Sequence, residues 1–172
     1  NKLRDCIGAE HMSGYLKIGD IKGESTDDGH KDWINLLSVS SNITRPMGAG
    51  ASGSTRHRSS ATFGDVVCVK EVDASTPKLQ EAIADGTCFP KVNIDLCTSS
   101  EGGKRIPYLL WELKQARVTS YSVSGAADGS MPPTEQLSLN YEAIKLTYDQ
   151  IGKDNKSQGK VEYNWNIEEG VV

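Results

Sequence analysis

The sequence predicts a mainly β fold, an antiparallel β-barrel of two curved sheets with one α-helix. Most apolar residues recur at every second position, as in half-buried strands, and only one stretch carries helix signals. Two long segments change the parity of their apolar residues midway, which indicates β-bulges and bent strands. Bent long strands suit a closed barrel better than a flat sandwich.

The opening strand lies within residues 14–28, where Leu16 and Ile18 alternate with polar residues and glycine. Glycines punctuate the segment that follows as turns. Asp27, Asp28 and His30 offer metal-ligand chemistry, but no second ligand cluster completes a coordination sphere. We therefore interpret 27–30 as a solvated turn and expect no metal or other cofactor.

A second strand is predicted over residues 34–41. Leu37 and Val39 should face the barrel core, and Ser38 and Ser40 the other side. The third strand is expected over residues 61–72, and its apolar side chains Phe63, Val67 and Val69 should share one face.

Residues 44–60 form the one stretch of low complexity. Its glycines formally match the GxGxxG dinucleotide fingerprint at Gly48, Gly50 and Gly53, but no helical pattern follows, so the sequence favours a flexible loop. Arginines give this loop positive charge in an acidic protein. It is either a solvated loop or an arm that contacts an acidic surface on another subunit. The basic residues concerned are Arg45, Arg56 and Arg58.

The helix is predicted over residues 75–86, with Thr76 as N-cap, Pro77 at the first helical position and Gly86 as C-cap. Its narrow apolar stripe should seal one end or side of the barrel. The remaining strands are expected around 92–96, over 105–124 and 135–151 with a bend in each, and over 161–167.

Composition limits the possible functions. The 172 residues carry a formal charge of -4, which argues against binding driven by charge to nucleic acid or an anionic membrane, and no apolar run is long enough to span a membrane. The four cysteines show no metal-type spacing, and we expect reduced thiols in a reducing cytoplasm. Residues 1–12 lack the apolar core of a signal peptide.

Several segments resemble one known family. YLKIGDIKGES at residues 15–25, followed by GHKD at 29–32, resembles the start of the Hcp proteins, the haemolysin-coregulated tube subunits of bacterial type VI secretion. DASTPKL at 73–79, LSLNY at 137–141 and YNWNI at 163–167 fit the same family in the same order.

The resemblance covers residues 13–172, which we interpret as a single domain; residues 1–12 are then an upstream start or a cloning remnant. It implies a barrel that assembles into hexameric rings and stacked tubes, with a spike protein at the tip, effector proteins in the lumen and a contractile sheath outside. It further implies assembly in the bacterial cytoplasm and secretion without a signal peptide.

No catalytic constellation is visible in the sequence. Carboxylates are spread along the chain, no GxSxG motif is present, and His11, His30 and His57 fall in the N-terminal segment or in predicted loops. We therefore expect no enzyme. Two hypotheses stand: a self-assembling tube subunit, in which Ser38 and Ser40 line the lumen and the arginine-flanked loop acts in ring stacking, and a monomeric ligand-binding β-barrel. Native mass separates them.

Overall fold

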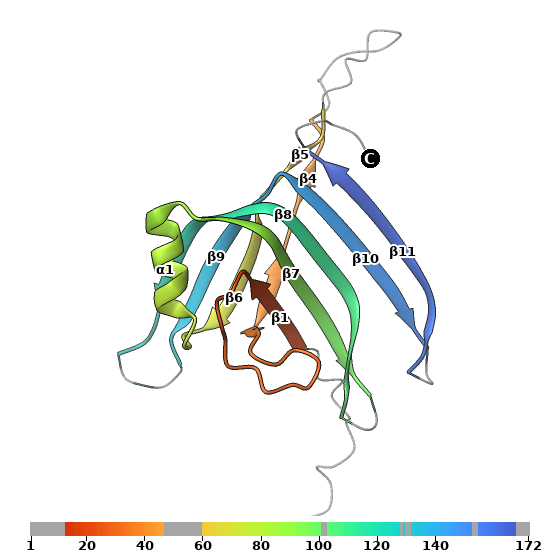
Figure 1. The fold of residues 1–172 in the computed structure, drawn as a ribbon, viewed down its shortest axis with the longest axis horizontal. Coiled ribbons are helices and arrows are strands. Elements are labelled where there is room, and N and C mark those ends of the chain that lie inside the picture. The colour runs from red at the N-terminus through yellow and green to blue at the C-terminus, as the bar shows by residue number, and fades with distance from the viewer. Residues whose placement is uncertain are drawn as a thin grey trace, which may run out of the picture.

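The computed structural model describes residues 13–46, 60–100, 103–127, 129, 132–152 and 155–167. Strands dominate, and the described residues contain one helix, α1 (Figure 1). In chain order the elements are β1 (Ser13–Ile18), β2 (Ile34–Leu36), β3 (Ser38–Ser40), β4 (Ile43–Thr44), β5 (Thr62–Phe63), β6 (Val66–Glu71), α1 (Thr76–Asp85), β7 (Cys88–Ser99), β8 (Arg105–Ser124), β9 (Thr134–Asn140), β10 (Ala143–Ile151) and β11 (Ser157–Asn166).

The main sheet follows the antiparallel order β2-β1-β7-β8-β9-β6-β3, and its two end strands are neighbours in the chain. Leu37 alone separates β2 from β3, and its N–H donates to the Val69 carbonyl of β6 at 2.7 Å. The two ends of the strand path therefore meet at Leu37, as they do in a β-barrel. The prediction of one strand over 34–41 was wrong, as was the burial of Leu37: at the crossover its side chain is 58% exposed.

Strand β8 changes partner along its length. Its first part pairs with β10 and its second part with β9. Gln115 lies between the two parts with a positive φ of 49°, and the register with β9 shifts between Val118 and Ser120. These irregularities confirm the predicted bend. The predicted strand over 135–151 is instead two strands, β9 and β10, separated by Tyr141 and Glu142.

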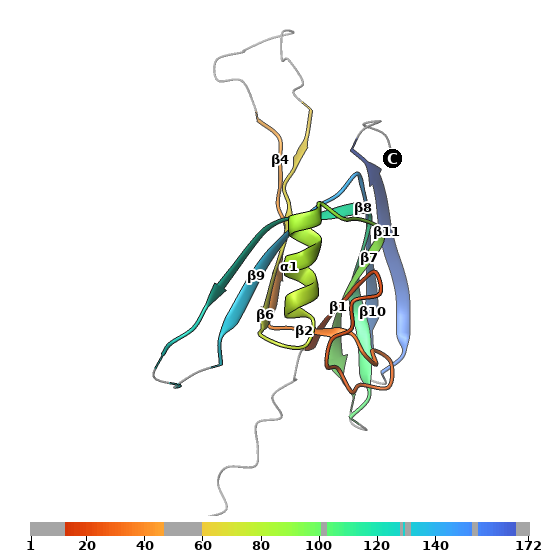
Figure 2. The same cartoon turned by 60° about the vertical axis from the view of Figure 1, so that its left-hand side comes forward.

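Strands β10 and β11 extend the sheet away from the barrel beside β8, as Figure 1 shows. Helix α1 packs beside the barrel (Figure 2), with Leu79 and Ala82 buried. Gly86 ends it in the left-handed conformation, as predicted. Thr76 is the first helical residue rather than the N-cap, and its Oγ1 accepts a hydrogen bond from the Asp73 N–H at 3.1 Å.

The interior is filled by aliphatic side chains from the barrel strands and α1. The core side chains with no exposed surface are Leu16, Ile18, Ile34, Val66, Cys68, Leu79, Val92, Ile94, Leu113, Ala116, Leu137 and Leu139. Val67 and Val69 share one face of β6, as predicted, whereas Phe63 belongs to the separate strand β5. The buried face of β6 is the other one, which carries Val66 and Cys68. Both parities of β6 are apolar, so alternation could not choose between them.

Candidate assembly surfaces

Ser38 and Ser40 lie exposed on β3, where they pair across the strands with Val69 and Val67 of β6. The same rows continue onto β9 and β8 through side chains that carry no charge. The further members are Gln136 and Ser138 on β9 and Ser120 and Ser122 on β8. We call these rows the hydroxyl face. It is an outer face of the barrel whose two rows carry serines, a glutamine and the half-buried Val67 and Val69, but no charged side chain.

The second surface lies where β8, β10 and β11 run side by side. Residues that pair directly across neighbouring strands lie on the same face of a sheet. On one face of these three strands the paired side chains are apolar, from the part that covers the core to the part that is exposed. Its inner part is covered, with Ile144 4% exposed, whereas Tyr148 and Val161 are 47% and 72% exposed. We call this exposed part the apolar face. Among the described residues, the outer edge of β11 has no strand partner.

The opposite face of the same strands is charged. Lys91 of β7 pairs with Glu112 of β8 at 2.7 Å, and Lys145 of β10 pairs with Glu162 of β11 at 2.9 Å. Glu112 and Lys145 are themselves opposite each other in register, so charges alternate in sign across four strands. The two faces of this part of the sheet thus differ sharply in polarity.

Strands β4 and β5 form a two-stranded ribbon that projects from the barrel (Figures 1 and 2). Its base is fixed by the stacking of Phe63 on Trp165, with ring centroids 5.8 Å apart, and by a bond from the Gly64 N–H to the Asn42 carbonyl at 2.9 Å. Arg45 is exposed directly after β4. The other residues predicted for ring stacking lie outside the described residues: Gly48, Gly50, Gly53, Arg56 and Arg58.

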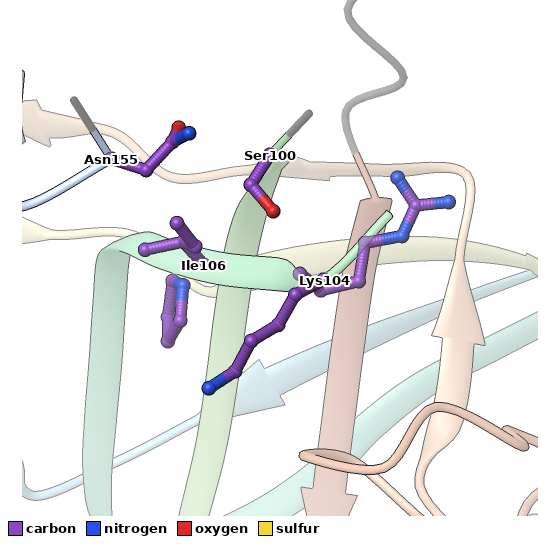
Figure 3. Close-up of a pocket in the computed structure, with 6 residues that line it drawn as sticks. Ser100, Lys104, Ile106 and Asn155 are labelled. Carbon is purple, nitrogen blue, oxygen red and sulfur yellow. The ribbon is translucent and has the colours of Figure 1, made fainter. Parts of the chain in front are cut away.

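A pocket of about 440 Å³ lies at the other end of the β10–β11 hairpin, between its turn and the turn that joins β7 to β8 (Figure 3). Ile106 and Pro107 supply apolar lining, and Lys104 and Arg105 supply cations. Ser100 and Asn155 add neutral polar groups. Sequence reasoning did not find this pocket, because its lining comes from two turns about fifty positions apart.

His30 does not lie in a solvated turn, so that interpretation was wrong for this residue. Its ring is buried, stacks on Tyr15 with centroids 4.2 Å apart, and places Nδ1 and Nε2 each 2.9 Å from a carboxylate oxygen, of Asp27 and Asp95 respectively. A neutral imidazole carries a single N–H. Both contacts can be hydrogen bonds only if the ring and the two carboxyl groups together hold one proton more than a neutral imidazole and two carboxylates do.

This cluster fixes the segment between β1 and β2 to the outer face of the barrel. Burial raises the pKa of Asp95, and the hydrogen bond from His30 offsets that effect only in part. Burial also raises the pKa of the neighbouring Cys97 thiol to about 12. A thiol with that pKa stays protonated at neutral pH and is a poor nucleophile, so we assign the cluster a structural role.

A second buried polar network was also missed by sequence reasoning. Lys70 of β6 and Glu135 of β9 are both fully buried and lie 2.6 Å apart. Glu135 accepts further hydrogen bonds from Thr76 at 2.6 Å and Tyr121 at 2.7 Å, while Lys70 also pairs with Asp73 at 2.9 Å. The network joins the beginning of α1 to three strands of the barrel.

Within the described ranges, no three His, Cys, Asp or Glu side chains gather as a group that could hold a metal ion. In the same part of the chain, no helix has the length and apolar character needed to cross a membrane. The surfaces that remain as candidates for function are thus the hydroxyl face, the apolar face, the β4–β5 ribbon and the pocket.

Comparison with known proteins identifies the family. The model of the family described as "Type VI secretion system effector, Hcp" matches residues 15–148. The chain belongs to the Hcp family. It is 31% identical to the protein hcp1 of Pseudomonas aeruginosa over 158 residues, covering 91% of this chain and 96% of that protein.

Solved structures agree with this Hcp assignment. A type six secretion system protein matches with a TM-score of 0.85 at 25% identity, covering 93% of this chain and 98% of the other. Hcp1 from Salmonella typhimurium matches in fold with a TM-score of 0.72 at 23% identity, over 92% and 96% of the two chains. This Hcp chain is therefore a subunit of the type VI secretion tube rather than a monomeric ligand-binding barrel.

Proposed function

We propose that this Hcp chain forms a hexameric ring in which the apolar face contacts the next subunit. The observation that carries this proposal is the exposure of Tyr148 and Val161 on a face that is otherwise continuous with the core. Burial of such side chains against a partner is favourable by about 25 cal/mol per Å² of apolar surface. In a ring, this face meets a different surface of the next subunit, so the contact is heterologous, and a heterologous contact whose rotation closes gives a ring.

Charge does not supply the cohesion of this ring. Six chains of formal charge -4 carry -24 together, so the net electrostatic term between subunits is repulsive. The unpaired edge of β11 adds backbone groups that can bond to another chain. Apolar and backbone contacts are therefore the forces that we assign to the ring interface.

The test is Val161→Glu, which places a charge in the proposed interface. We expect a monomer by light scattering at a concentration where the unchanged chain is a hexamer, with the circular dichroism spectrum and thermal stability preserved because Val161 is 72% exposed. Asn164→Glu is the matched control, since Asn164 is exposed on the opposite face of the same strand. A hexamer from Val161→Glu would remove this face from the ring interface.

Stacking of the rings is proposed to use the β4–β5 ribbon and the arginines around it. The ribbon projects from one end of the barrel, and its base is held by aromatic stacking and backbone bonds. Asp27 and Asp28 lie toward the other end, where His30 joins their turn to the last part of β7. Pairing between Arg45, Arg56 or Arg58 and this acidic turn would join neighbouring rings end to end.

The hydroxyl face is the surface that we assign to the lumen, where Ser38 and Ser40 would contact effector proteins. Small uncharged side chains offer hydrogen bonds without favouring cargo of one charge sign. A spike protein at the tube tip and a contractile sheath around the tube complete the proposed assembly. The tube would assemble in the cytoplasm and leave the cell without a signal peptide, and its action would be mechanical rather than catalytic.

A further inference from the structure

We propose that the pocket between the β7–β8 and β10–β11 turns receives Glu168 and Glu169 from a chain of the adjacent ring. The two glutamates follow β11 directly in the sequence. This inference rests on the proposed stacking, since it names a second contact between rings and the residues on each side. We call Glu168 and Glu169 the acidic tail.

The chemistry of the pocket matches such a segment. Lys104 and Arg105 both line the volume of about 440 Å³, and Ser100 and Asn155 add a hydroxyl and an amide (Figure 3). Arginine and lysine side chains form charge-assisted hydrogen bonds with carboxylates. The apolar lining from Ile106 and Pro107 can contact the aliphatic part of a glutamate side chain.

The acidic tail cannot reach the pocket of its own chain. The pocket lies at the β10–β11 turn, whereas the Ile167 N–H is bonded to the Glu142 carbonyl at the other end of the hairpin, at 2.8 Å. Strand β11, Ser157–Asn166, spans 10 residues and therefore about 30 Å. Two residues beyond Ile167 reach at most about 7 Å. The glutamates can fill only the pocket of another copy.

The positions of tail and pocket select a head-to-tail arrangement. The tail leaves β11 at the end where the β4–β5 ribbon is anchored, because Phe63 of β5 stacks on Trp165 (Figure 1). The pocket lies at the opposite end of the β10–β11 hairpin, where the turn carries Asn155. Rings that stack with the ribbon end of one against the turn end of the next would bring tail and pocket together.

The first experiment measures the two charge reversals and their combination. Lys104→Glu, and separately Glu168→Lys with Glu169→Lys, should each leave the hexamer mass unchanged and shorten tubes in electron micrographs. Breaking an exposed pair changes an equilibrium by about twofold, so six pairs together should weaken ring–ring association on the order of fiftyfold. All three substitutions in one chain should restore part of the tube length, because the carboxylate introduced at position 104 can pair with the tail lysines while Arg105 keeps its charge.

Lys78→Glu is the matched control, since Lys78 is an exposed lysine on α1, away from the pocket. Tubes of normal length from the tail variant would overturn the proposal, and so would a combined variant that stays as short as the single ones. Loss of the hexamer in the pocket variant would also overturn it, by placing Lys104 in the ring interface.

The second experiment separates this inference from the proposed assembly. A synthetic peptide of residues 164–172, NWNIEEGVV, is titrated into the full chain and followed by NMR. We expect amide shifts at Ser100, Ile106 and Asn155, and loss of these shifts with Lys104→Glu or with Lys in place of both glutamates in the peptide. Shifts without any tubes would support the pocket while refuting stacking; tubes without shifts would refute the pocket alone.

Discussion

Lys70 shows how much one buried residue contributes to this fold. A lysine is rarely fully buried, because removing its charge from water is costly unless a partner compensates it. Here Glu135 and Asp73 supply that compensation, and the Glu71 carbonyl accepts a further bond at 2.7 Å. The strand pattern gave no sign of this arrangement, since Lys70 and Glu135 lie 65 positions apart and each resembles a surface residue in sequence.

We expect Lys70→Met to destabilise the protein strongly, because it leaves the buried Glu135 without its cation. Removal of one partner of a buried pair costs about 3–5 kcal/mol, and denaturant unfolding would measure it. Lys78→Met is the matched control, since Lys78 pairs with Glu81 on the exposed surface of α1 and should change stability little. Equal stability of the two variants would show that the buried pair does not anchor α1.

Elements with a single apolar face, such as strand β1 and helix α1, were predicted from the sequence. The bend of β8 was also predicted, because a shift of the apolar residues from odd to even positions within a strand indicates a β-bulge. Two features were not predicted. The buried face of β6 could not be chosen, because both of its faces are apolar. The division of residues 34–40 into two strands was missed, because the change of strand partner at Leu37 leaves no local sequence pattern.

The candidate surfaces were predicted less well than the elements. Ser38 and Ser40 were identified from alternation within one strand, and the structure places both exposed. Their extension onto β9 and β8 depends on pairing between distant strands, so it required the register. The same holds for the apolar face, since Tyr148 and Val161 become neighbours only through the β10–β11 pairing.

Strand β3 permits a test of the lumen assignment. Ser40→Gln enlarges an exposed side chain, so we expect a folded hexamer with altered effector retention in pull-down assays. Val39→Asp is the contrasting variant, because Val39 packs against the core and a charge there lacks a partner. It should lower the melting temperature and the yield of rings. Effector retention unchanged by Ser40→Gln would argue against a lumen role for the hydroxyl face.

At the scale of the whole molecule, the barrel presents different chemistry in different directions. The hydroxyl face is uncharged, the exposed part of the β10–β11 layer is apolar on one side and charged on the other, and the two ends carry the ribbon and the pocket. Contacts around a ring and contacts between rings would therefore rest on different forces: apolar burial in the first case and pairs of opposite charge in the second.

This division predicts that salt separates stacking from ring formation. Exposed charge pairs are screened within about 8 Å at physiological ionic strength and more strongly at higher salt, whereas apolar burial is not weakened by screening. Rising sodium chloride should therefore shorten tubes while light scattering still reports hexamers. A variant without residues 48–53 that also carries Arg56→Glu and Arg58→Glu should show short tubes already at low salt, with its hexamer mass unchanged.

Two controls define what this experiment can exclude. Val161→Glu should lose the ring at every salt concentration, because its effect lies in the apolar contact. Sodium sulfate, which strengthens apolar burial, should stabilise the ring relative to chloride at equal ionic strength. If hexamers and tubes instead dissociate together along the chloride series, one set of ionic contacts must hold both, and the assignment of the apolar face to the ring would be wrong.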